Sequence, residues 1–287
     1  IYAPAPAPTG WPRGHRPTRR EKQERELALQ RDAAVSDLAT LLERMTHQPV
    51  AVLRGPPPPD VPGTPILIGD VAKERFGALK THVPGAQAFA VVVTRDALGL
   101  YGEGDLATSY AVYELLDRLG CRWYFPGPLG EVVPEHPRLA LPLGRAELAP
   151  STLYRGLWYA DSDYRRRNRL GGLRLETGQG LETWVDEAER HAHPEWQGSV
   201  AGKSGGTLLK WHEPGVAHAI AQAILRRQAA DPVDSYSLSP HDGLDFDESP
   251  EERALDAGDW DPTVNQVSHT DRLLVLANRV AGEVAAA

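Results

Sequence analysis

The stretch DLATSYAVYELLDRLGCRWYFPGPLGEVVPEHPRLAL, residues 105–141, decides the fold of the first half of the chain. Apolar residues recur at helical spacing along two strips up to Leu119, which is typical of a helix packed on a sheet. Asp105 is a good N-cap residue, and Gly120 stands where a left-handed C-cap is expected. An aromatic run over 121–125 then indicates a strand. The segment therefore predicts a helix, a tight turn and a strand within an α/β domain.

The residues before this stretch supply the rest of that domain. Thr18 and Glu21 match a capping box, and we expect the helix they start to reach about Thr46. Short apolar runs predict strands over 49–53, 65–69, 88–93 and 98–102. The low-complexity sequence APAPAP predicts a flexible lead over residues 1–17. One α/β domain is thus expected over 18–148, where a proline-rich junction marks its end.

Residues 149–287 have a different pattern. We expect strands over 152–159, 169–177, 207–211 and 234–240, and helices over 181–193, 214–227 and 270–287. Strands that alternate with helices favour βα units around a parallel sheet. Such units make half of a (β/α)₈ barrel, which usually needs roughly 250 residues. The predicted fold class is therefore α/β: a small N-terminal α/β sandwich domain plus a partial, barrel-like C-terminal region, either a fragment or a truncated open half-barrel.

Composition limits the partners. The 287 residues carry a net charge of -8, which argues against nucleic acid because phosphate binding needs clustered cations. No apolar run approaches the roughly 18 residues that span a bilayer, and no signal peptide is visible in a chain that starts with Ile1. The single cysteine, Cys121, excludes an intramolecular disulfide, and its apolar neighbours predict an inert buried thiol. The oligomeric state stays open.

One ordered set of motifs resembles a known family. The motifs are YAVYELL at 110–116, LGCRWYFPG at 119–127 and GEVVP at 130–134. Together they resemble the family in which an α-glucuronidase-type N-terminal domain precedes a glycoside-hydrolase-like barrel. PILIGDVAKERFG upstream, and STLYRGLWY, RRRNRLG, HAHPEW and YSLSPHDG downstream, are similar to further segments of that family. The resemblance covers most of residues 20–280 and weakens towards the C-terminus.

The resemblance implies a carbohydrate-active protein, with a secreted or periplasmic location and a glycan or oligosaccharide as its partner. No cofactor is expected. Relatives tend to carry closely spaced cysteines after the D-G pair, whereas this chain has Asp247-Glu248-Ser249-Pro250 there. The family's catalytic pair is not carried over, and the catalytic candidates come from this chain's own residues.

Barrel enzymes place catalytic groups just after the strand C-termini, and SPHDG follows the last expected strand. Glycoside hydrolysis needs two carboxyl groups facing one glycosidic bond. Asp242 is the best-placed first carboxyl, with His241 beside it as a substrate-binding residue, and Glu248 is the candidate partner within an acidic loop that also holds Asp245 and Asp247. The alternatives are an Asx-turn at the Asp-Gly pair and a simply solvated loop.

Two further groups are candidate substrate-binding residues. Arg155, Trp158 and Tyr159 end the first expected barrel strand, where aromatic faces could stack on sugar rings and the guanidinium could bind a carboxylate. The alternative for Trp158 is a place in the core. His193 and Glu195 belong to an H-A-H-P-E run that matches a loop segment of the resembled family. This run lacks any recognised zinc spacing, so no metal ligand is assigned.

Three functions remain open from the sequence. The first is a glycosidase-like enzyme acting on a glycan, with a uronic-acid or amino-sugar residue among the options. The second is a non-catalytic glycan-binding or structural protein with a degenerate barrel. The third is a metal-dependent hydrolase that uses the histidines between 191 and 218. Carboxyl groups about 5 to 9.5 Å apart across a cleft would favour the first over the second.

Overall fold

The computed structural model describes residues 1–173, 175–230, 232–243 and 245–287. The chain forms two compact units, Ile1–Leu173 and Arg174–Ala287. The junction expected after residue 148 lies inside the first unit, because the residues that follow it up to 173 pack with that unit. In the described residues the structure is a mixed α/β fold with a six-stranded sheet.

The sheet of the first unit is mixed. Its strands follow the order β2-β1-β3-β5-β4-β8. They span β1 Tyr2–Ala3, β2 Leu53–Arg54, β3 Ile66–Ile68, β4 Phe89–Val93, β5 Leu98–Gly102 and β8 Gly144–Leu148. β1, β2, β3 and β5 pair in parallel, while β4 runs antiparallel to both β5 and β8. The β4–β5 pair is antiparallel because the link between the two strands is too short for a crossover.

The expected flexible lead over 1–17 is wrong for its first residues. Tyr2 and Ala3 form strand β1 in the interior of the sheet, hydrogen-bonded between β2 and β3. Both side chains are buried, and so is Ala7. The main chain of Ala7 donates to Asp32 of the long helix at 2.6 Å. This proline- and alanine-rich segment is therefore ordered, because strand pairing and the hydrogen bond to Asp32 satisfy its main-chain polar groups.

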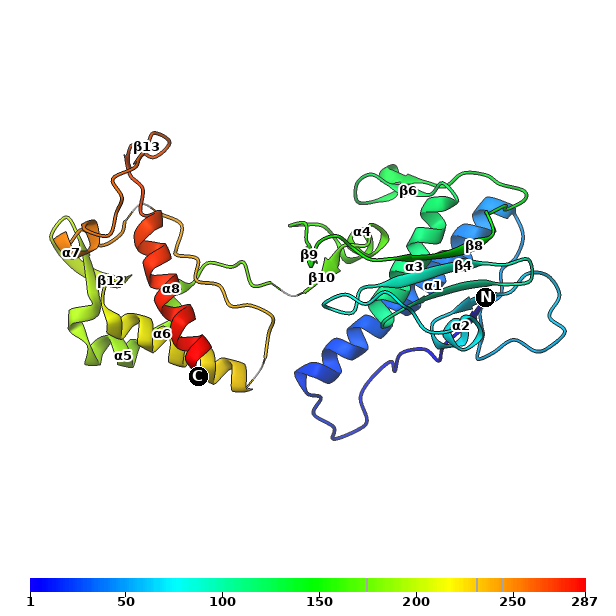
Figure 1. Ribbon diagram of the computed structural model, residues 1–287, viewed down its shortest axis with the longest axis horizontal. Helices are drawn as coiled ribbons and strands as arrows, with labels where there is room; N and C mark the ends of the chain where they lie inside the picture. The colour runs from blue at the N-terminus through cyan, green and yellow to red at the C-terminus, as the bar shows by residue number, and fades with distance from the viewer. Residues whose placement is uncertain (174, 231, 244) are drawn as a thin grey trace. The chain divides into compact units, whose positions relative to one another are not determined.

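Helices cover the two faces of the sheet. α1 (Arg19–Thr46) and α3 (Asp105–Arg118) lie side by side across one face, as Figure 1 shows, and α2 (Asp70–Phe76) packs on the other. Side chains of β4 alternate accordingly: Phe89, Val91 and Val93 join the core under α1 and α3, and Ala90 and Val92 join the core under α2. This alternation is the period of two that a strand imposes.

The ends of the two long helices follow local rules. The capping box of Thr18 and Glu21 is confirmed. Asp105 is not the N-cap of α3, since Gly104 takes that position and the Asp105 carboxylate pairs with Arg31 at 2.7 Å. At the other end Gly120 has φ of 95°, its N–H donates to the Asp117 carbonyl, and the following N–H reaches back to Leu116. This is a Schellman arrangement, which places a glycine where a side chain would be strained.

Two hairpins complete the first unit. β6 (Arg122–Trp123) pairs with β7 (Glu131–Val132) around the 3-10 turn η1 (Pro128–Gly130), and β9 (Tyr154–Arg155) pairs with β10 (Gly171–Gly172) around α4 (Ser162–Arg167). In place of the strands expected over 152–159 and 169–177, the described residues there form two strands of two residues each, and residue 174 lies outside the described part of the chain.

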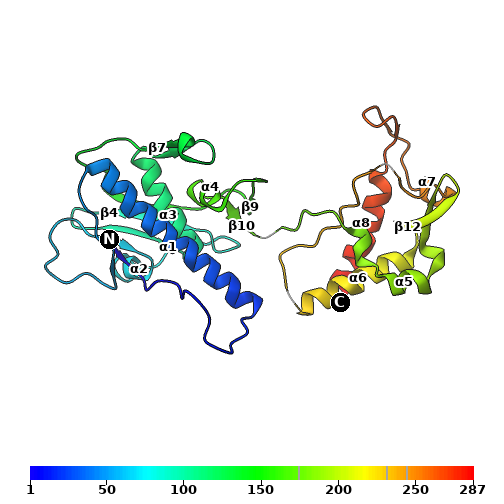
Figure 2. The ribbon, with the colours of Figure 1, turned by 180° about the vertical axis from the view of Figure 1, so that it is seen from behind.

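The second unit has its own apolar core. It comprises η2 Leu181–Trp184, α5 Glu187–Ala192, η3 Pro194–Trp196, β11 Gln197–Val200, β12 Lys203–Leu209, α6 Pro214–Ala230, α7 Pro250–Arg253, β13 Trp260–Asp261, β14 Gln266–Val267 and α8 Thr270–Ala286. α6 and α8 pack against each other, as Figure 2 shows, and they enclose Val216, Ile220 and Leu276 together with Trp196 and Trp211.

Several expected elements of this unit are different in the structure. The expected helix over 181–193 is divided into η2 and α5, and the expected strand over 234–240 is reduced to one isolated bridge, between Gln179 and Ser239. The hairpins β11–β12 and β13–β14 are antiparallel. The helices expected over 214–227 and 270–287 are confirmed as α6 and α8. Nowhere in the described ranges does a helix combine the length and the apolar character needed to cross a bilayer.

Candidate functional site

Arg155 is held by the first unit's own groups. It lies on β9, and its guanidinium donates to the side chains of Gln87 at 2.8 Å and Tyr110 at 3.0 Å, and to the carbonyls of Arg169 and Thr152, each at 3.0 Å. It also stacks over the Tyr110 ring and lines a cavity of about 320 Å³. Most of its donors are therefore already used in hydrogen bonds within the first unit.

Trp158 and Tyr159 stand in water. The exposed fraction is 67% for Trp158 and 96% for Tyr159, so the alternative of a core tryptophan is excluded. Their rings meet edge to face with centroids 6.1 Å apart. Tyr159 has a φ of 60°, a left-handed conformation that is uncommon for a residue with a side chain. The carbonyl of Leu157, the residue before Trp158, accepts from Arg165 of α4 at 2.9 Å, which ties the loop to that helix.

Helix α4 is itself anchored by an ionic network. The carboxylate of Asp37, on α1, accepts from Tyr113 at 2.7 Å, from Arg166 at 3.1 Å and from Arg167 at 3.0 Å. Burial tends to raise the pKa of Asp37, but the hydrogen bonds from Arg167, Tyr113 and Arg166 outweigh it and lower the pKa. Arg167 also reaches Glu131 at 3.3 Å. The loop that carries Trp158 and Tyr159, the aromatic loop, is therefore bound to α4, and α4 is in turn bound to α1.

The two candidate catalytic carboxyls lie in the second unit. Asp242 is exposed, and no hydrogen bond joins its carboxylate to any residue that the structure describes. The Asx-turn alternative would use the main chain of residue 244, which lies outside the described residues. Glu248 is also exposed, and it accepts from the main chain of Ala201 at 3.0 Å. The nearby Asp247 is buried and accepts from the main-chain N–H of Ser199 at 2.6 Å, which makes it a structural tie to β11.

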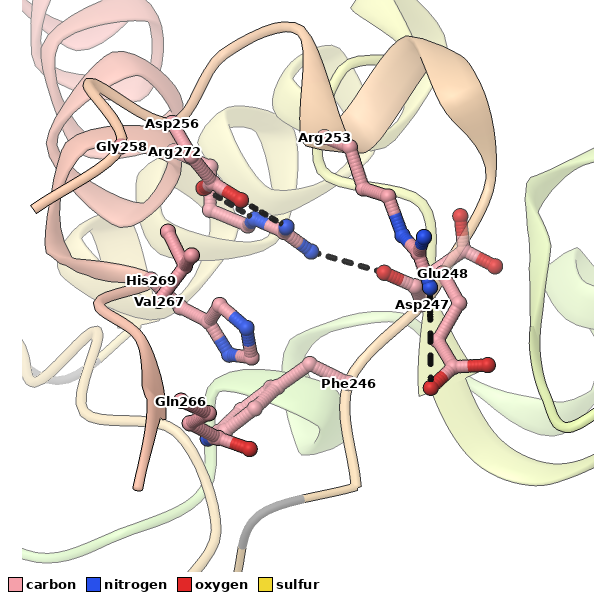
Figure 3. Close-up of a pocket in the computed structure, with 10 residues that line it drawn as sticks. All are labelled: Phe246, Asp247, Glu248, Arg253, Asp256, Gly258, Gln266, Val267, His269 and Arg272. Atoms are coloured by element: carbon pink, nitrogen blue, oxygen red, sulfur yellow. Dashed lines mark hydrogen bonds and ion pairs between the residues drawn. The ribbon is translucent and has the colours of Figure 1, made fainter. Parts of the chain in front are cut away.

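Glu248 lines a cavity of about 360 Å³, shown in Figure 3. On one side lies Arg272 of α8, which is buried and donates to both oxygens of Asp256 and, at 2.7 Å, to the main-chain carbonyl of Asp247. Facing it, the ring of His269 lies edge to face on Phe246 with centroids 5.0 Å apart. Burial, followed by the charge of Arg272, lowers the pKa of His269. The imidazole is accordingly favoured in its neutral form.

His241 lies in a second cavity of the same unit. Its Nδ1 is 3.1 Å from the Glu182 carboxylate, which is buried, and both residues line a space of about 450 Å³. The His241 ring also packs on Phe246, with centroids 5.1 Å apart. Phe246, which lines the Glu248 cavity, thus contacts both His241 and His269.

The remaining histidines form separate pairs. His193 bonds Glu195 at 2.9 Å and stacks on Trp196. His191 lies 3.5 Å from Glu187, and His218 lies 2.7 Å from Glu283. His212 contacts two carboxylates, those of Glu252 and Glu213. Within the described parts of the chain, no group of three or more His, Cys, Asp or Glu residues is arranged to hold a metal ion.

The structure groups the predicted residues by unit. Arg155, Trp158 and Tyr159 belong to the first, and Asp242, Glu248, His241, His193 and Glu195 belong to the second. Within the second unit, His241 and Glu248 line different cavities, with Phe246 packed on His241 and lining the Glu248 cavity.

Sequence reasoning missed Glu182, Arg190 and Arg272. Arg272 had a detectable signal, a cation among the apolar positions of a predicted helix. Glu182 and Arg190 had none, because each sits in an ordinary polar stretch whose spatial neighbours are distant in sequence.

Comparison with other proteins adds no family. No protein-family model matches the chain, and no curated protein is similar to it.

Proposed function

We propose that this chain is a carbohydrate-active protein that recognises a glycan through the aromatic loop of its first unit. The observation that carries the proposal is the pair Trp158 and Tyr159, two large rings in edge-to-face contact whose exposed fractions are 67% and 96%. Exposed aromatic rings do not gain the favourable free energy that burial of their apolar surface would give. Such an exposed pair is therefore typical of a binding surface. The resemblance of the sequence to a glycoside-hydrolase-like family supports the same class of ligand.

The support beneath the loop strengthens this proposal. A binding surface gains affinity when its side chains are already positioned, because less entropy is lost on association. The loop is tied to α4 through Arg165, and α4 is tied to α1 through Asp37. The left-handed backbone at Tyr159 is a local strain of the kind that clusters at functional sites.

The test is binding of oligosaccharides, measured by calorimetry on a panel of neutral and acidic sugars. Trp158→Ala should weaken binding about tenfold, since one lost stacking contact is worth about 1.4 kcal/mol. Trp260→Ala is the matched control, because Trp260 is also exposed, at 59%, but lies on β13 of the other unit. Equal weakening by both changes, or no binding by the unaltered protein, would contradict the proposal.

Hydrolysis of the glycan is the second candidate function, and the presence of Glu248 in the cavity of Figure 3 favours it. In this proposal Glu248 and Asp242 supply the carboxyl pair and the second unit belongs to a partial barrel. The same oligosaccharides, read for released reducing ends, test it. Loss of release in Glu248→Gln with oligosaccharide binding retained would support hydrolysis, and the absence of release by the unaltered protein would leave recognition alone.

A further inference from the structure

The chain has several pairs of histidine and carboxylate, and one of them differs from the rest. His193–Glu195 and His218–Glu283 are exposed pairs on the surface. His212 has a buried partner, Glu252, but its second ring nitrogen lies 3.3 Å from Glu213. His241 combines a buried carboxylate on Nδ1 with an Nε2 that has no hydrogen-bonding partner among the described residues.

The two halves of this pair are fixed by the main chain. The N–H groups of Gly180 and Leu181, at the start of η2, both donate to the carbonyl of Ser239 at 3.0 Å. The indole of Trp184 donates to the carbonyl of Ser237 at 2.9 Å. Glu182 is therefore held next to His241, although the two residues are 59 positions apart in the sequence.

A carboxylate on Nδ1 selects the tautomer that carries its proton on Nδ1 and leaves Nε2 as the basic atom. The same carboxylate stabilises the imidazolium that forms when Nε2 takes a proton. Both residues line a cavity of about 450 Å³, which is large enough for a small organic molecule.

Arg190 provides a positive group in the same cavity. Its Nη1 donates to the carbonyls of Glu182 and Val185, which orients the guanidinium. Its Nε and Nη2 have no hydrogen-bonding partner in the described parts of the chain. Acyl transfer to water requires a base that activates the water, donors that stabilise the oxyanion and a cavity that holds the substrate. His241, Arg190 and this cavity supply them.

We infer that Glu182, His241 and Arg190 form a hydrolytic site for a small carboxylic ester, distinct from the glycan surface on the other unit. His241 Nε2 takes a proton from water as the water oxygen bonds to the carbonyl carbon. The carbonyl electron pair moves to its oxygen, whose charge Arg190 stabilises. The carbonyl then re-forms, the ester C–O bond breaks, and the imidazolium proton passes to the departing alkoxide.

The products are a carboxylic acid and an alcohol, and His241 returns to its neutral form. Glu182 acts as a positioning residue, because its part in this reaction is to orient His241 and stabilise its imidazolium. A glycosidic bond is a less suitable substrate here, because its cleavage needs a carboxyl group that can give up a proton, and the Glu182 carboxylate is engaged by His241.

The experiment uses the whole chain with p-nitrophenyl acetate as the probe. His241→Asn is the main variant, because an amide can still donate to Glu182 but cannot act as a base. Its kcat/KM should fall about 100-fold, the lower end of what a general base contributes. His82→Asn is the matched control, since His82 has the same Nδ1 contact, to Glu103 at 2.8 Å, on the surface of the first unit. It should leave the rate unchanged.

Two further readouts separate a chemical role from a structural one. Added imidazole should restore hydrolysis to His241→Ala by occupying the emptied space and should not stimulate His82→Ala. Glu182→Gln should lower kcat with KM unchanged, and Glu182→Asp should recover part of the loss. The inference is overturned if the unaltered protein is no faster than His241→Asn, if the His82 change lowers the rate as much, or if folded His241→Ala shows no rescue. Loss of oligosaccharide binding would not bear on it.

Discussion

Leu116 is the residue on which the packing of the first unit can be tested most directly. It lies on α3 with no exposed surface, in the core shared with α1 and the sheet. The sequence predicted it as buried from the apolar strips of the helix, and the structure confirms this. A buried leucine reduced to alanine loses its transfer energy and leaves a cavity behind.

We expect Leu116→Ala to lower the free energy of unfolding by about 2 to 5 kcal/mol, measured by chemical denaturation. Leu129→Ala is the control, because Leu129 is 91% exposed and its change should stay within about 0.5 kcal/mol. An unchanged midpoint for Leu116→Ala would mean that this helix does not pack as described.

Cys121 shows how position decides the chemistry of a residue. It follows Gly120 into the core, and its Sγ lies 4.0 Å from the sulfur of Met45. Burial raises the pKa of the thiol to about 11. The reactive thiolate is therefore scarce at neutral pH, in agreement with the prediction of an inert buried thiol.

At the scale of an element, the edge strand β8 depends on Glu147. The carboxylate accepts from Arg145 on the same strand at 2.9 Å and from the main-chain N–H groups of Lys80 and Thr81, also at 2.9 Å. These bonds, with Arg145 contributing most, lower the pKa of Glu147 to about 2. The carboxylate thus joins the edge of the sheet to the loop that precedes β4.

This contact makes part of the stability dependent on pH. The pKa is lower in the folded chain than in the unfolded chain, where it is about 4.3, so the unfolded state binds the proton more readily. The contribution is fully present above about pH 4.3 and is lost as the pH falls towards 2. Glu147→Gln should therefore lower the melting temperature clearly at pH 7 and less at pH 3.

Glu135→Gln is the control for that measurement, because Glu135 is exposed and has no hydrogen bond or ion pair within the described residues. Its melting temperature should match that of the unaltered protein at both values of pH. If the effect of Glu147→Gln were the same at pH 3 and pH 7, the ionised carboxylate would not be the stabilising group.

At the scale of the whole molecule, the position of the boundary between the two units can be tested. α4 lies beyond the expected junction at residue 148, yet Arg166 and Arg167 satisfy the Asp37 carboxylate of α1. Removing both arginines would leave a largely buried carboxylate with one hydrogen bond, from Tyr113. An unpaired buried charge is strongly destabilising.

We therefore expect a chain of residues 1–173 to unfold at a higher temperature than a chain of residues 1–148, measured by circular dichroism. A chain of residues 174–287 should fold on its own, since its core of Trp196, Ile220 and Leu276 belongs to it alone. Equal melting temperatures for the two N-terminal chains would place the boundary where the sequence suggested. Asp37→Asn in the 1–148 chain should recover part of the lost stability.

The elements that sequence predicted correctly depend on near neighbours. α1 could be predicted because Thr18 and Glu21 are three positions apart, and the end of α3 could be predicted because Gly120 permits a left-handed backbone. The burial of Leu116 and Cys121 follows from a helical period and an apolar context, which are likewise local.

The tertiary structure alone decided the rest, because the relevant partners are far apart in the chain. Tyr2 becomes a strand residue since Leu53 and Leu67 lie on either side of it, and nothing in a short window around APAPAP shows this pairing. Glu182 contacts His241 because backbone hydrogen bonds join their two segments, and neither segment has a periodic sequence pattern that would predict this pairing. Local spacing determines which helices form, whereas long-range pairing determines the order of the sheet and which polar groups share a cavity.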